Sequence, residues 1–231
     1  MAMLGNGRMV IWFELDSPDI DPEHQHWHAH EHMYERLGIP GFLRGRRAIS
    51  LSAPRKYFVT YEVENFDVLK SAPYHKCLNN PTTWTQKMMP HQRNVVRSLC
   101  RIGGSYGSGI GQVIATIRFA PAPGKEDALR GWLNKTALPH LPAKAGMVGA
   151  HFLEAIKQTG QPPTNEQKLR GANDGEVDWV LLVEGYDAAA VNGVLQKELS
   201  ADELARHGAA AGAITGVYVH DLALTQQDVG R

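Results

Sequence analysis

The chain repeats its own pattern of predicted elements once, and this repeat constrains the fold more than any other feature. Residues 8–15 and residues 112–119 both alternate apolar side chains in the way that strands do. Each strand is followed by a helical segment with a tryptophan at a matching place, Trp27 in the first and Trp132 in the second. A repeat of this length predicts two copies of one supersecondary unit in a single polypeptide.

The first copy, residues 8–102, has the predicted order strand, helix, strand, strand, helix, strand. Its strands are expected at 8–15, 42–52, 56–64 and 94–102. This order is the split βαβ pattern of ferredoxin-like units. The second copy, residues 112–225, is expected to have the same order. We therefore predict an α+β protein made of two fused ferredoxin-like βαββαβ repeats.

A linker separates the two copies, and a longer hairpin distinguishes the second copy from the first. Residues 103–111, GGSYGSGIG, are rich in glycine and predict a flexible linker. Residues 183–187 mirror residues 63–67, and on this alignment the hairpin of the second copy is the longer one. The added residues fall in a polar stretch, 156–176, which we expect to be a mobile loop.

Composition excludes several classes of partner. Among 231 residues, 24 Lys and Arg balance 24 Asp and Glu, so no global field attracts nucleic acid or an acidic membrane surface. The sequence has no secretory signal and no membrane span, and Cys77 and Cys100 lack metal-ligand spacing, as expected of reduced thiols. We expect a cytoplasmic protein, a monomer or homodimer, that acts on a small molecule.

The stretch 21–42, DPEHQHWHAHEHMYERLGIPGF, carries five of the eleven histidines at alternate positions. Asp21 can cap a helix, Pro22 suits its first turn, and Gly38 with Pro40 ends it. These caps predict one short helix, and the role of its histidines has to be argued separately.

Helical phase divides those histidines between two faces. At about 100° per residue, one stripe contains Trp27, His30, Tyr34 and Leu37. On this basis His28 and His32 face away. If the stripe packs on a sheet, its polar groups need partners, because an unpaired buried donor or acceptor costs about 1 to 3 kcal/mol.

The two copies differ at these polar positions. Aligned on the two tryptophans, His30 corresponds to Lys135 and Tyr34 to Pro139, whereas the apolar positions are kept. Arg44 and Arg46 likewise correspond to Gly149 and His151. Folding requires the apolar positions in both copies, so polar residues present in only one copy indicate a functional site there.

This tandem pattern resembles the dimeric α/β-barrel superfamily, which includes antibiotic-biosynthesis monooxygenases, EthD-like proteins, muconolactone isomerases and haem-degrading monooxygenases. The resemblance covers the whole chain and implies an intramolecular barrel, with one polypeptide supplying both halves. It also implies a pocket between the helices and the sheet of one half. The haem-degrading branch is recognised by a set of Asn, Trp and His residues. This set has no convincing match here, so that branch is kept only as a minor alternative.

Carried over by position, the pocket would hold catalytic residues from the helix and binding residues from the helix and the adjoining strands. We predict His30 as a general base, Glu31 as its partner and Tyr34 or Tyr57 as a donor to a developing oxyanion. The predicted substrate-binding residues are His26, Trp27, Arg44, Arg46, Tyr57, Tyr61 and Trp84. Arg44 and Arg46 share one strand face and can clamp an acidic group. The expected function is cofactor-independent acid–base catalysis of oxygenation, isomerisation or cleavage on a small apolar, aromatic or cyclic metabolite.

Other interpretations remain open. His28 and His32 have the i, i+4 spacing of a metal-binding pair, but a third ligand is needed and HExxH is absent. A haem-binding protein and a non-catalytic small-ligand module are further alternatives. A hydrogen-bonded, partly buried helix edge is the structural alternative for His30, Glu31 and Tyr34. The arginines can pair with Glu62, Glu64 or Glu31 instead of a substrate.

Overall fold

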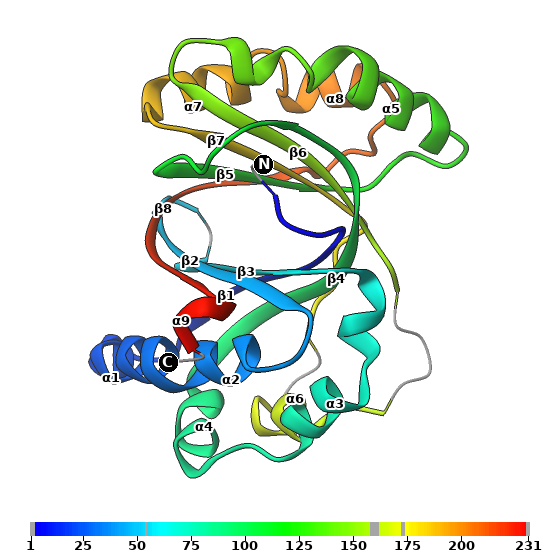
Figure 1. The fold of residues 1–231 in the computed structure, drawn as a ribbon. Coiled ribbons are helices and arrows are strands. Elements are labelled where there is room, and N and C mark those ends of the chain that lie inside the picture. Colours follow the sequence, from blue (N-terminus) through cyan, green and yellow to red (C-terminus); the bar gives the residue numbers. More distant parts are fainter. Residues whose placement is uncertain (1–2, 54, 158–161, 172–173, 230–231) are drawn as a thin grey trace.

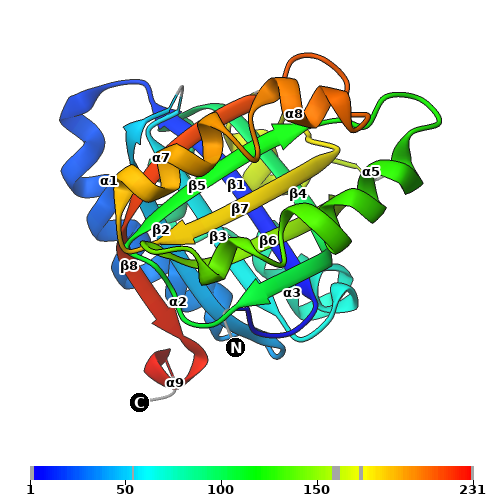
Figure 2. The same cartoon turned by 90° about the horizontal axis from the view of Figure 1, so that it is seen from above.

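The eight strands close into one antiparallel barrel. The computed structural model describes residues 3–53, 55–157, 162–171 and 174–229, and its strands follow each other around the barrel in the order β1-β3-β2-β8-β5-β7-β6-β4 (Figures 1 and 2). Their bounds are β1 Gly7–Leu15, β2 Phe42–Ser52, β3 Tyr57–Val63, β4 Gln92–Gly107, β5 Val113–Phe119, β6 Met147–Ala155, β7 Trp179–Gly185 and β8 Ile214–Thr225. The predicted fold class, two fused ferredoxin-like repeats forming an intramolecular barrel, is confirmed.

The two copies join edge to edge through two strand pairs. β2 of the first copy pairs with β8 of the second, and β4 pairs with β6. Tyr106 lies opposite Ala150 in this second pair. Residues 103–107 of the predicted linker are therefore the end of a strand, because β6 supplies hydrogen-bond partners to their backbone.

The strand registers correct the predicted alignment of the hairpins. Glu62 lies opposite Arg44 in β2, and Glu184 lies opposite Gly149 in β6. Since Arg44 and Gly149 correspond between the copies, the counterpart of Glu184 is Glu62 and not Glu64.

Helices cover the outside of the barrel in two groups. The first copy contributes α1 Asp21–Trp27, α2 Met33–Leu37, α3 Ala72–Asn79 and α4 Thr83–Met88, and the second contributes α5 Glu126–Trp132, α7 Ala188–Gln196 and α8 Ala201–Arg206. Figure 1 shows the second group above the barrel and the first group below it. The short helix α6, Asn165–Leu169, belongs to the second copy but lies among the helices of the first. The last helix, α9, spans Gln226–Val229. Within the described residues, no helix has the length and apolar character needed to cross a bilayer.

Both copies have a π turn at the same place in their first helix. Residues 28–32 follow Trp27 and residues 133–137 follow Trp132. A π turn contains one more residue than an α turn, so it rotates all later side chains about the helix axis. This shared distortion supports the alignment of the copies on their tryptophans.

The core has three layers, because strand residues alternate between the barrel interior and its outer faces. The interior is filled by a cluster that includes Trp12, Phe58 and Tyr218. One outer cluster lies under α5, α7 and α8 and is apolar throughout. The other lies under α1 to α3, and this layer contains buried polar groups that have no counterpart in the second copy.

Candidate active site

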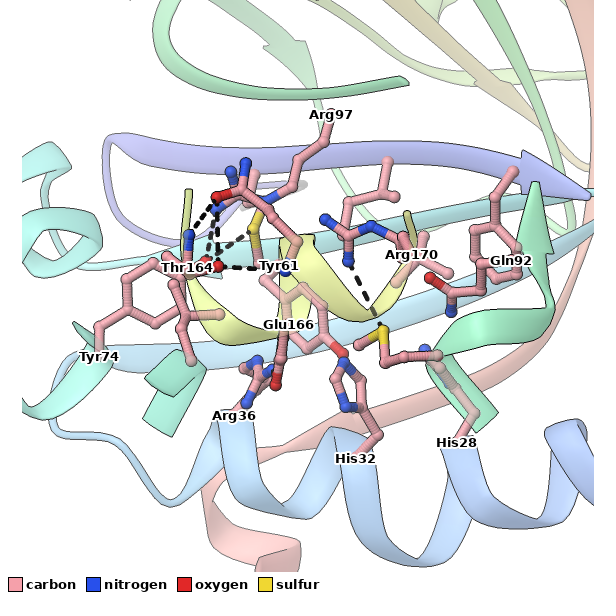
Figure 3. Close-up of a pocket in the computed structure, with 17 residues that line it drawn as sticks. His28, His32, Arg36, Tyr61, Tyr74, Gln92, Arg97, Thr164, Glu166 and Arg170 are labelled. Atoms are coloured by element: carbon pink, nitrogen blue, oxygen red, sulfur yellow. Dashed lines mark hydrogen bonds and ion pairs between the residues drawn. The ribbon is translucent and has the colours of Figure 1, made fainter. Parts of the chain in front are cut away.

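A small space, which we call the inner chamber, lies between helix 21–37 and the outer face of β1 and β3. It has a volume of about 30 Å³, and Figure 3 shows His28, His32 and Arg36 pointing into it from the helix. Glu166 and Gln167 of α6 also line this chamber. The lining residues used below are His28, His32, Arg36, Tyr61, Tyr74, Arg97, Thr164, Glu166, Gln167 and Arg170.

Three histidines on this helix are buried in a row. His24, His28 and His32 are exposed by 0, 2 and 6% respectively. Consecutive ring centroids lie 6.1 and 5.5 Å apart. The first ring is held by Gln92, whose Nε2 lies 3.2 Å from His24 Nε2. His28 and His32 are the members of the row that line the inner chamber.

The chamber residues include polar atoms that the described residues leave without a hydrogen bond. These atoms are His28 Nδ1, His32 Nδ1 and Tyr61 Oη. Each unpaired buried group costs about 1 to 3 kcal/mol. A space of about 30 Å³ has room for roughly two water-sized molecules. The chamber can therefore hold a small polar guest that completes these bonds.

Burial also sets the protonation of these imidazoles. Desolvation lowers the pKa of His28 and of His32 well below 6.5, and the charges of Arg47 and Arg36 lower it further. Both rings are consequently neutral at neutral pH. A neutral imidazole has a free lone pair that can accept a proton, but the same burial disfavours the charged ring. Proton uptake by these histidines therefore needs a negative charge that develops beside them.

The helix α6 closes the chamber through a buried ion pair. Glu166 of α6 is 3% exposed and accepts a hydrogen bond from Arg36, which is 2% exposed. Arg36 also donates to Cys77 Sγ at 2.7 Å. Within the predicted loop, Asn165–Leu169 form this helix, so that part of the stretch is helical and docks by the ion pair. Residues 158–161 and 172–173 of that prediction lie outside the described residues.

A larger outer cavity adjoins the chamber. It has a volume of about 600 Å³ and lies between α3, β4 and residues 162–168 and 174–177. The two spaces share the side chains of Tyr74, Leu78, Arg97, Thr164 and Gln167 as a common wall. An organic molecule fits the outer cavity but not the chamber.

The predicted catalytic residues of the helix do not line the chamber. His26, His30 and Tyr34 are exposed, and the rings of His26 and His30 stack on each other at 4.4 Å. The expectation that His30 and Tyr34 face the sheet is wrong. The buried stripe is centred between Trp27 and His28, and the π turn then carries Met33 inward in place of Tyr34.

Glu31 joins two helices. Its Oε1 accepts hydrogen bonds from Thr82 Oγ1 at 2.6 Å and from Trp27 Nε1 at 3.2 Å. Trp27 is fully buried, and half-buried Trp84 of α4 packs against His26 with ring centroids 5.4 Å apart. These residues attach α4 to the helix and do not reach the chamber.

The predicted anchors Arg44 and Arg46 lie inside the barrel. Arg44 donates to Glu62 at 2.7 to 3.1 Å, and Arg46 donates to Glu184 at 2.9 and 3.0 Å. The alternative of pairing with Glu62 is thus the one realised for Arg44. Both arginines lie on the face of β2 that points into the barrel, whereas helix 21–37 lies outside the barrel. The structure therefore does not bring these arginines to the helix residues.

The two predicted tyrosines differ in their positions. Tyr57 donates from its Oη to Asp21 at the start of the helix, whereas Tyr61 lines the inner chamber. Of the predicted substrate-binding residues, Tyr61 is thus brought together with the buried histidines.

The residues that sequence reasoning missed, above all Arg97 and Glu166, come from β4 and α6. A signal for the buried row was present, since His24, His28, His32 and Arg36 recur every four residues.

The chamber meets only part of the requirements of a metal or a haem. His28 and His32 are two nitrogen ligands, but no group of three or more ligating side chains of His, Cys, Asp or Glu converges among the described residues. The chamber volume is far below that of a porphyrin, so a haem does not fit beside these two histidines. Exposed His75 of α3 borders the outer cavity.

Comparison with known proteins identifies the fold. The sequence matches no protein family model and no curated protein. An anthrone oxidase-like protein superposes with a TM-score of 0.65 at 9% identity, covering 96% of this chain and 93% of that one. A candidate monooxygenase of Fusobacterium nucleatum gives 0.58 at 9% identity, with 96% of each chain covered. Chlorite dismutase of Candidatus Nitrospira defluvii, in complex with imidazole, gives 0.53 at 10% identity, with 98 and 94% covered.

These structures share the dimeric α/β barrel. The present chain has this fold in tandem form, with both halves of the barrel in one polypeptide. At such low identity the likeness concerns the fold alone, and the function has to be argued from the site.

Proposed function

We propose that this protein is a monooxygenase-type enzyme that oxidises a small cyclic or aromatic substrate without an organic cofactor. The observation that carries the proposal is the inner chamber with its unpaired polar atoms on His28, His32 and Tyr61. The anthrone oxidase-like and candidate monooxygenase structures support the same reaction class.

The substrate we envisage has an acidic C–H bond next to a carbonyl group. His28 or His32 takes the proton, since both imidazoles are neutral, and Tyr61 donates a hydrogen bond to the enolate oxygen. The carbanion gives its electrons to dioxygen and forms a C–O bond. Loss of water from the resulting peroxide leaves a new carbonyl group. The substrate loses two hydrogens and gains one oxygen atom, so no external reductant is needed.

The outer cavity and the inner chamber have different roles in this reaction. The outer cavity accommodates the body of the substrate, and the chamber accommodates dioxygen and the reacting atoms. Docked α6 keeps bulk water out of the chamber, which strengthens electrostatic interactions there.

Oxygen uptake with anthrone as the probe tests the proposal. We expect His28→Gln or His32→Gln to lower the rate by at least about 100-fold, the usual contribution of a general base. His26→Gln and His30→Gln are matched controls, because these histidines lie on the exposed side of the same helix, and they should leave the rate unchanged.

The opposite result, loss of activity in the His30 variant alone, would restore the assignment made from helical phase. The haem alternative is decided in the same assay. It requires that turnover begin only after haemin is added and that His75→Ala abolish it.

A further inference from the structure

Arg97 lies in the wall shared by the inner chamber and the outer cavity. It belongs to β4 and lies opposite Ile11 on the outer face of the sheet. Its Nη2 donates to Tyr74 Oη at 2.7 Å, and Tyr74 Oη in turn donates to Met9 Sδ. Among the described residues, no carboxylate forms an ion pair with this guanidinium.

This situation differs from that of the neighbouring arginines. Arg36 pairs with Glu166, and Arg170 pairs with Asp174 at 3.0 Å. Asp174 and Glu166 are also the carboxylates that act on the pKa of Arg97, and both are already engaged. Within the described part of the chain, the hydrogen bond to Tyr74 uses one donor of the Arg97 guanidinium, and further N–H donors remain for a ligand.

The outer cavity combines apolar walls with positive charge. Its apolar side chains include Leu69, Leu78, Leu99, Ile156, Pro162, Pro163 and Val177. Lys70, Lys157 and Lys168 border it together with Arg97, against the two carboxylates of Asp174 and Glu176. A site of this kind suits an apolar ring that carries one anionic group.

We propose that Arg97 binds the anionic oxygen, a carboxylate or a phenolate, of a small cyclic or aromatic acid held in the outer cavity. This inference rests on the proposed function in that it defines the substrate class of the same site. With the anionic oxygen on Arg97, the ring extends along the shared wall toward His28 and His32. The planar guanidinium fixes orientation as well as charge.

Binding of 1-naphthoate and of its neutral analogue 1-naphthamide tests this assignment without turnover. We expect the unmodified protein to bind naphthoate at least tenfold more tightly in calorimetric titrations. Arg97→Gln should remove the preference and leave the affinity for naphthamide unchanged. Arg101→Gln is the matched control, because Arg101 is an exposed arginine of the same strand that borders neither space, and it should keep the preference.

A second measurement needs no variant and so does not depend on the folding of Arg97→Gln. Phenylglyoxal modifies accessible guanidinium groups, and peptide mapping should show that naphthoate protects Arg97 but not Arg101. Equal affinity for the two probes, or equal labelling of Arg97 with and without naphthoate, would overturn the assignment. If the protein is not a monooxygenase, oxygen uptake will be absent while the tighter binding of naphthoate over naphthamide persists. The failure of the proposed function and the failure of this inference are therefore distinguishable.

Discussion

Four charged residues lie almost fully buried inside the barrel, where charged side chains are rare unless they are paired. Arg8, Arg46, Glu62 and Glu184 are each exposed by 1% or less. A buried ion pair offsets its desolvation only if its hydrogen bonds are well made. Glu184 meets this condition, because its oxygens accept from Arg46 and from the backbone N–H of Gly111 at 3.2 Å.

Replacement of Glu184 by glutamine should therefore destabilise the fold strongly. Glu184→Gln removes the carboxylate that accepts two hydrogen bonds from Arg46 and leaves only Glu62, 3.4 Å from Arg46 Nε, to balance this buried charge. We expect a loss of about 3 to 5 kcal/mol in the free energy of unfolding. Urea denaturation at pH 7.5 measures this change. Asp178→Asn is the control, because its partner Lys157 is exposed, and it should cost less than about 1 kcal/mol. Equal effects of the two substitutions would contradict the prediction.

At the scale of elements, the first helix of each copy shows how a local distortion selects the residues of a site. The π turn is present in both copies, but only the first copy places histidines and an arginine on the inward side. In the second copy the equivalent layer contains apolar residues such as Leu129, Leu133 and Leu138. The same backbone thus supports a packed core in one half and a polar chamber in the other.

The helix α6 is the element that completes the chamber. It is attached by one buried ion pair, by two hydrogen bonds from Asn165 to Asn79 and by the packing of Leu169. Arg36 is held by Glu166 and by the sulfur of Cys77. The thiol is a weak acceptor, so the carboxylate provides most of the compensation for the buried charge.

We expect Glu166→Gln to release α6 from the barrel. Trypsin should then cleave after Lys168 and Arg170 at least about tenfold faster than in the unmodified protein, because local unfolding exposes the backbone. Glu176→Gln serves as the control, since this exposed carboxylate lies in the same segment, and its cleavage rate should not change. An unaltered rate in Glu166→Gln would show that other contacts hold α6.

At the scale of the whole molecule, buried histidines lie in both halves of the barrel. His24, His28 and His32 belong to the first copy and His151 to the second. Desolvation lowers the pKa of His24 to about 3 and that of His151 to about 4, and it lowers the other two well below 6.5. All four are neutral in the folded protein over a range in which the unfolded chain binds protons.

The stability of the protein should therefore fall as the pH is lowered from 7.5 to 5.5. Unfolding takes up protons below pH 6.5, the ordinary pKa of histidine, and each buried histidine then costs about 1.4 kcal/mol at pH 5.5. Urea denaturation across this range should show a loss of several kcal/mol.

A matched pair of variants identifies the source of this pH dependence. His32→Gln should reduce the loss of stability at pH 5.5 by about 1.4 kcal/mol, the share of one buried histidine. The double variant His26→Gln with His30→Gln should retain the full loss, because those side chains are exposed. Constant stability between pH 7.5 and 5.5 would contradict the assignment of neutral buried imidazoles.

The sequence by itself determined the repeat, the fold class and most strand bounds. These follow from short-range patterns, since alternation of apolar residues and helix caps act within one element. The restriction of the polar set to the first copy was also visible in the sequence, but His30, Tyr34, Arg44 and Arg46 do not line the chamber.

Tertiary structure alone decided which residues of that half meet. The π turn changes the phase of the helix, and no local signal in the sequence predicts it. Arg44 and Arg46 point into the barrel, where they form ion pairs with Glu62 of β3 and Glu184 of β7. Arg97 and Glu166 join the histidines only when β4 and α6 approach helix 21–37, across separations of up to 130 residues. Contacts of that range depend on how the barrel closes, which is a property of the packed chain and not of any segment.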